Sequence, residues 1–126
     1  MFARIMMFFV ALGLSATLAA QTGHPAKGSW SGELTPASSQ ATRIRLLIDD
    51  HNGELSGAIN PGRNGVEMKS VVLDPSTWSM KITAAMPEGE LVLDGKLNNL
   101  GSWTNRKYTG TYTLGNTRGT FDIALN

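Results

Sequence analysis

Five glycines interrupt otherwise alternating apolar segments, and this repeated pattern constrains the fold more than any other feature of the chain. Each glycine lies on the apolar face of its segment, because successive side chains of a strand point to opposite faces. Inside a strand, glycine allows the strand to coil sharply at a barrel corner, or it allows a neighbouring group to approach closely. The pattern therefore predicts a small closed β-barrel. The five segments are Trp30-x-Gly32-x-Leu34, Leu55-x-Gly57-x-Ile59, Leu93-x-Gly95-x-Leu97, Tyr108-x-Gly110-x-Tyr112 and Thr117-x-Gly119-x-Phe121.

The first part of the chain has the layout of an export signal. Arg4 precedes an apolar run over 5–14, and a stretch of small residues follows it. The apolar run is too short to span a bilayer comfortably, which favours a cleavable signal over a membrane anchor. Export would place the protein in the periplasm or outside the cell. We expect a signal peptide over 1–20 that is cut after Ala19 or Ala20, a flexible leader over 21–28 and a β-barrel domain over 29–126.

Charge and cysteine content exclude several classes of function. Loss of the signal removes Arg4 from the 11 basic residues of the chain, which leaves as many basic as acidic residues, since the latter number 10. A neutral domain has no electrostatic attraction for nucleic acid or for an anionic membrane. The chain has no cysteine, so disulfides and thiol chemistry are absent. One apolar core must therefore stabilise the domain.

Strand patterns follow one another at short spacing, with turn residues between them. The segment 42–50 alternates cleanly between aliphatic and charged residues, and Asn52-Gly53 after it is a strong hairpin signal. Short links favour an antiparallel meander, so we expect an all-β, eight-stranded, antiparallel up-and-down barrel. The strands carry charged residues on the face opposite their apolar face, and these charges could not face lipid, which excludes a barrel inserted in a membrane. The expected strands cover 29–35, 42–50, 54–60, 66–73, 78–84, 90–97, 107–114 and 117–125.

No group of residues in the sequence suggests catalysis. His24 falls in the leader and His51 in a hairpin turn, and neither has a neighbouring nucleophile or metal ligand. The segment 49–54 resembles a calcium loop only faintly, because most of the ligand spacing is missing. We therefore expect neither an enzyme nor a metal site nor a cofactor.

Aromatic residues are the remaining candidates for a binding site. Tyr108 and Tyr112 lie on the inward face of their strand, where they either fill the core or line a cavity. Trp78 and Trp103 lie beside loops, and an exposed tryptophan is costly unless something covers it. These four residues are the predicted ligand site, with the two tryptophans near one mouth of the barrel.

The segment Gly28-Ser29-Trp30 resembles the opening of the calycin barrels, the lipocalin and avidin-like families, whose first strand begins with Gly-x-Trp. The Trp-x-Gly, Leu-x-Gly and Tyr-x-Gly-x-Tyr segments are also similar to avidin-like strands. The resemblance extends in layout over 28–125 and includes small exported bacterial barrels of uncharacterised function. In these families a basic residue from the end of the barrel packs over the tryptophan, which implies that Arg118 contacts Trp30. The chain lacks the second lipocalin motif and an avidin biotin site.

Two functions fit these features. The first is an exported soluble barrel that binds a small, mostly apolar molecule at one mouth, with the inward glycines leaving room inside. The second is a packed barrel that serves as a glycan- or protein-interaction module without an internal ligand. Neither function involves nucleic acid or membrane insertion, and both leave the oligomeric state open.

Overall fold

The structure is a computed structural model that describes residues 25–101 and 105–126. The expected signal peptide over 1–20 lies outside the described residues, as do His24 and Trp103.

Eight β-strands form the fold, as the sequence predicts, and their ends differ from the expected ones by at most two residues. The described residues contain no helix that is long and apolar enough to cross a membrane. The strands are β1 (Gly28–Pro36), β2 (Thr42–His51), β3 (Glu54–Ile59), β4 (Val66–Asp74), β5 (Ser79–Met86), β6 (Gly89–Asn98), β7 (Lys107–Leu114) and β8 (Thr117–Leu125).

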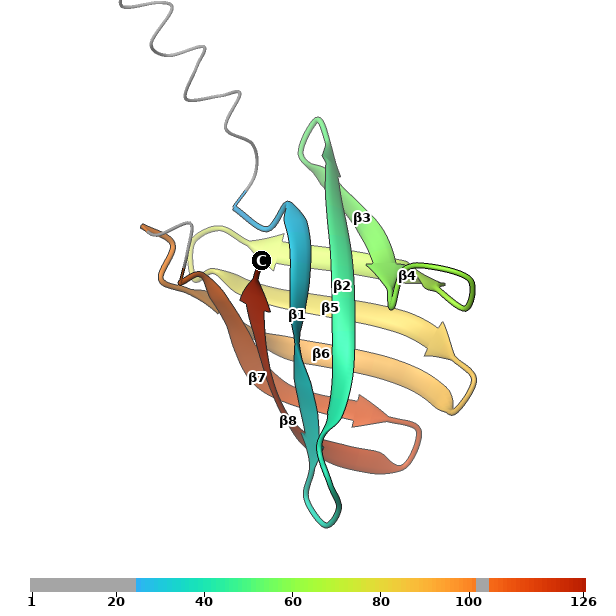
Figure 1. Cartoon of the computed structure of the whole chain (residues 1–126). Coiled ribbons are helices and arrows are strands. Elements are labelled where there is room, and N and C mark those ends of the chain that lie inside the picture. Colours follow the sequence, from blue (N-terminus) through green and yellow to red (C-terminus); the bar gives the residue numbers. More distant parts are fainter. Residues whose placement is uncertain (1–24, 102–104) are drawn as a thin grey trace, which may run out of the picture.

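Each strand pairs with the next in antiparallel orientation, and β1 pairs with β8 to close the barrel (Figure 1). The closing register places Trp30 opposite Leu125 and Pro36 opposite Gly119. The all-β, antiparallel closed barrel predicted from the sequence is therefore confirmed. Pairing of β1 with β8 leaves neither the first nor the last strand as a free sheet edge.

Alternation along the strands separates a buried interior from a polar exterior. On β2, Ile44, Leu46 and Ile48 are buried while Arg43 and Arg45 are exposed. Several interior side chains have no accessible area at all. Neighbouring atoms pack against these side chains on all sides. The residues at 0 % exposure are Ala26, Trp30, Leu46, Ile59, Ile82, Ala84, Leu93, Tyr108 and Ile123.

The strand glycines allow neighbouring backbones to approach closely. Gly95 of β6 and Gly110 of β7 are direct partners, and a Cβ on Gly110 would overlap the carbonyl oxygen of Asp94. A Cβ on Gly95 would meet Cζ of Phe121 at 2.7 Å, so this ring covers the gap that the glycine leaves. Close approach is thus confirmed. The expectation that the glycines leave empty interior room is wrong, because backbone and ring atoms fill it.

The barrel has two ends that differ in how the chain covers them. The N-terminal end carries residues 25–27, the β2–β3 hairpin turn and the β4–β5 and β6–β7 loops (Figure 1). The opposite end carries the β1–β2, β3–β4, β5–β6 and β7–β8 connections.

Candidate functional site

Residues 25–27 cover the N-terminal end of the barrel. Ala26 is fully buried, and its carbonyl accepts a hydrogen bond from Nε1 of Trp30 at 2.9 Å. Arg106, only 3 % exposed, donates from Nη1 to the carbonyl of Pro25 at 2.9 Å and from Nη2 to the carbonyl of Leu100 at 2.7 Å. Burial lowers the pKa of Arg106 from its ordinary value. Residues 25–27, which the sequence assigned to the leader, are therefore packed on the barrel.

The predicted contact of Arg118 with Trp30 is wrong, and the arginine at the barrel end that carries Trp30 is Arg106. Trp30 pairs with Leu125, whose N–H donates to the carbonyl of Arg106 at 3.0 Å. Arg118 is exposed and lies opposite Thr113. It is the second residue of β8, at the opposite end, and seven steps along the extended strand lead from it to Leu125, about 23 Å at ~3.3 Å per residue.

Arg106 precedes β7, so it lies outside the last strand, from which the sequence prediction took Arg118. The position of Arg106 two residues before the inward Tyr108 was the available signal, since residues two apart on a strand share a face.

We expect Arg106→Ala to lower the free energy of unfolding by about 1–3 kcal/mol, because the carbonyls of Pro25 and Leu100 lose buried donors. Urea unfolding measures this loss, and the NMR resonance of the Trp30 Nε1–H should shift as residues 25–27 loosen. Arg118→Ala is the matched control and should change neither quantity. Equal effects of the two substitutions would contradict the assignment of Arg106.

Trp78 lies in the β4–β5 loop at this covered end rather than at an open mouth. Its φ of 60° is left-handed, which is strained for a bulky residue. Its N–H donates to the carbonyl of Asp74 at 2.7 Å, its carbonyl accepts from the N–H of Leu97 at 2.9 Å, and its side chain packs half-buried against the core. These contacts give Trp78 a structural role in the loop.

Tyr108 and Tyr112 are part of the core. The Tyr108 hydroxyl donates to the carbonyl of Met80 at 2.7 Å and lies 3.2 Å from that of Leu93, and its ring centroid lies 4.6 Å from that of Phe121. Burial, together with the nearby charge of Asp94, raises the pKa of Tyr108 far above its ordinary value, so the phenol stays neutral. Tyr112, at 4 % exposure, lies further along β7 toward the opposite end, and burial raises its pKa too.

The predicted ligand site is therefore not one cluster within the described residues. Trp78 belongs to the covered end, the two tyrosines are separated along β7, and Trp103 lies outside the described part of the chain.

A hollow of about 180 Å³ lies at the opposite end of the barrel. Thr42 lies at the rim, two residues before the inward Ile44 and directly opposite Leu34. The charged side chains at this hollow are Arg43 and Glu88, which have opposite signs. Its apolar lining comes from Leu34, Ile44, Met86, Leu91 and Leu114, and its polar lining from Thr42, Arg43, Asn60 and Glu88.

This mouth is shallow because the barrel below it is full. Ala84 on β5 and Leu93 on β6, the next inward positions from the mouth, are both 0 % exposed. Ligand pockets for drug-sized molecules have volumes of about 300–1,000 Å³. The mouth can therefore take only a short chain end or a single ring.

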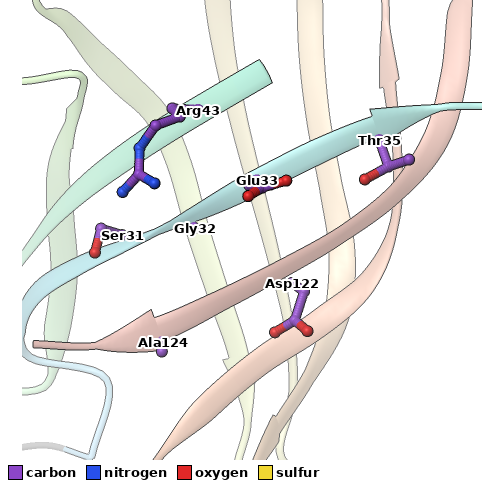
Figure 2. A pocket seen from close by; sticks show the side chains of 7 residues that line it. All are labelled: Ser31, Gly32, Glu33, Thr35, Arg43, Asp122 and Ala124. Carbon is purple, nitrogen blue, oxygen red and sulfur yellow. The ribbon is translucent and has the colours of Figure 1, made fainter. Parts of the chain in front are cut away.

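A larger hollow of about 510 Å³ lies on the outer wall, across β1, β2 and β8 (Figure 2). Glu33 and Asp122 are direct partners in the register, and Arg43 lies on the other side of Glu33. Nζ of Lys107 lies 3.4 Å from Oδ1 of Asp122. The hollow has no aromatic lining, so it offers no stacking surface and we regard it as a solvated charged face. Its lining residues are Ser31, Gly32, Glu33, Thr35, Arg43, Asp122 and Ala124.

Within 25–101 and 105–126, no three or more His, Asp or Glu side chains are grouped in a way that could hold a metal ion. Asp50, from the segment that faintly resembles a calcium loop, accepts a hydrogen bond from the N–H of Gly53 at 2.8 Å and so stabilises its own turn.

Comparison of the chain with models of protein families, with curated proteins and with solved structures finds no match. The barrel topology and the side-chain geometry therefore carry the functional argument.

Proposed function

We propose that this protein is an exported, non-catalytic barrel that binds a short apolar group. The binding site is the mouth at the barrel end that lies away from residues 25–27. The observation that carries the proposal is the asymmetry between the two ends. Residues 25–27 and Arg106 cover one end, whereas the other holds an apolar hollow with a polar rim. The resemblance to lipocalin and avidin-like barrels is part of this proposal, and so is a place of action in the periplasm or outside the cell.

The size of the mouth defines the ligand class. A volume of about 180 Å³ equals the space of about six water molecules at ~30 Å³ each, which suits the end of an alkyl chain or one ring. Burial of each CH₂ group contributes about 0.8 kcal/mol, so five or six groups contribute about 4–5 kcal/mol before the cost of association. The ligand should therefore bind weakly, with a Kd of about 1 mM or above. Whole retinoids or biotin are too large for this hollow.

The test is a titration of the ¹³C-methyl-labelled protein with octanol, followed by NMR. We expect saturable shifts of the methyl groups of Leu34, Leu91 and Leu114. Thr42→Phe should weaken binding at least about tenfold, because the ring fills the mouth from its rim. Thr111→Phe, exposed on the outer face of β7, is the matched control and should leave the Kd unchanged.

Two outcomes would contradict the proposal. One is the absence of saturable methyl shifts. The other is equal octanol binding by the Thr42→Phe and Thr111→Phe variants, because it would place the alcohol outside the mouth.

A second candidate function is a packed barrel that acts through its outer wall as an interaction module. The filled interior supports it. Two large apolar side chains are exposed on the outer wall, Leu47 of β2 at 45 % and Val72 of β4 at 63 %.

A further inference from the structure

The joint between β3 and β4 is the weakest part of the barrel wall. Only two residue pairs join these strands, Ala58 with Glu67 and Ile59 with Val66, whereas every other neighbouring pair of strands has six to eight. The β4–β5 ladder has a register shift between Met68 and Ser70 as well. Toward the N-terminal end, β3 and β4 therefore separate (Figure 1). We call this opening the β3–β4 seam.

The separation leaves part of the β3 edge without a partner strand. The N–H of Asn60 donates to the carbonyl of Arg45 on β2 at 2.7 Å. Backbone groups of successive residues point to opposite sides of an antiparallel strand, so those of Leu55 and Gly57 point away from β2, into the seam. In the described part of the chain no β4 residue lies opposite them. Such an edge can pair with another extended chain.

A hollow of about 340 Å³ adjoins this free edge. Its floor consists of small residues, Ser56, Gly57 and Ala58, and Met68 lies on the β4 side. Sδ of Met68 lies 3.1 Å from the point that a Cβ on Gly57 would occupy, so this flexible side chain borders the seam. Methionine repacks readily around different partners, which allows an added chain to enter.

Charge decides which kind of chain the seam would accept. Asp49 of β2 and Glu67 of β4 line the hollow from its two sides, and none of the residues that line it is basic. The contacts of Asp49 with Nζ of Lys27, at 4.0 Å, and with Nε2 of His51, at 3.7 Å, are both exposed. Exposed ion pairs contribute at most about 1 kcal/mol, so a stronger cation can replace them. The exposed Leu47 adds an apolar contact on the same side.

We propose that the β3–β4 seam is a docking site for an extended, cationic peptide segment of a partner protein, which adds as a strand to the free edge of β3. Main-chain hydrogen bonds from Leu55 and Gly57 would hold the segment, while Asp49 and Glu67 select basic side chains. The proposal deepens the second candidate function, since it names the surface and the chemistry of the partner. It is independent of ligand binding at the mouth.

The test uses the ¹⁵N-labelled protein and the peptide acetyl-Lys-Val-Lys-Val-Lys-amide. On binding, the amides of Leu55 and Gly57 should gain protection from hydrogen exchange. The double variant Asp49→Asn/Glu67→Gln should bind at least about fivefold more weakly. Glu33→Gln/Asp122→Asn is the matched control. It removes the same charge from the other outer-wall hollow, across β1, β2 and β8, and should leave the Kd for the peptide unchanged.

Three results would overturn the proposal: no binding of this peptide, equal weakening in both double variants, or binding without protection of Leu55 and Gly57. Protection of these amides that grows with protein concentration in the absence of peptide would also overturn it, because a second copy of the chain would then cover the seam. Thr42→Phe should leave peptide binding unchanged, which separates this test from that of the mouth.

Discussion

Trp30→Ala should lower the free energy of unfolding by about 3–5 kcal/mol, the usual loss when a fully buried large aromatic side chain is truncated. Trp30 has no accessible surface, and its indole N–H also holds the carbonyl of Ala26. For a domain of this size the loss corresponds to a fall in Tm of about 12 °C or more. Circular dichroism in urea measures the change without depending on tryptophan emission.

Trp30→Phe separates the two contributions of this residue. Phenylalanine keeps most of the apolar volume but cannot donate to Ala26, so the loss should be smaller, about 1–2 kcal/mol. If Trp30→Ala cost less than Trp30→Phe, or less than about 1 kcal/mol, the packed interior at this end would be refuted.

Gly110→Val should destabilise the barrel by about 3 kcal/mol, although valine is by far the better strand former. A Cβ at this position would overlap the carbonyl oxygen of Asp94 and lie 2.5 Å from the Cα of Gly95. These are backbone atoms of the paired strand, which cannot move aside as the end of a flexible side chain would. Strand propensity alone predicts a gain of up to about 1 kcal/mol, so the sign of the change decides between the two effects.

The matched control is Gly101→Ala, because a Cβ on Gly101 would meet no atom within 4 Å. Its unfolding free energy should stay within about 0.5 kcal/mol of the parent value. Gly110→Ala serves as a milder variant if the valine variant does not fold, and it should still lower Tm. An unchanged or raised Tm for both Gly110 variants would show that β6 and β7 do not approach as closely as described.

The strand order and the inward faces were predictable because they depend on local patterns. The alternation along β2 and the Asn52-Gly53 turn determine one hairpin, and the same reasoning repeats around the barrel. The strand glycines indicated close approach for a similar reason, since each interrupts an alternating face. These signals lie within a few residues of one another, so the sequence displays them directly.

The candidate site was less predictable, because it depends on which ends and side chains meet across the barrel. Arg106 rather than Arg118 reaches the end that carries Trp30, since the direction of β8 places Arg118 at the other end. The mouth combines residues from β1, β2, β5, β6 and β7 that are widely separated in sequence. No local pattern contains such a combination.

By itself, then, the sequence determined a cysteine-free chain of eight alternating segments that must bury one face each, because apolar periodicity and turn chemistry act over short distances. Only the tertiary structure decided which end of the barrel is covered. It also decided that backbone and ring atoms fill the space beside the glycines, and that β3 and β4 separate after only two residue pairs. These features arise from barrel closure, which imposes strand register and coiling on residues that are far apart along the chain.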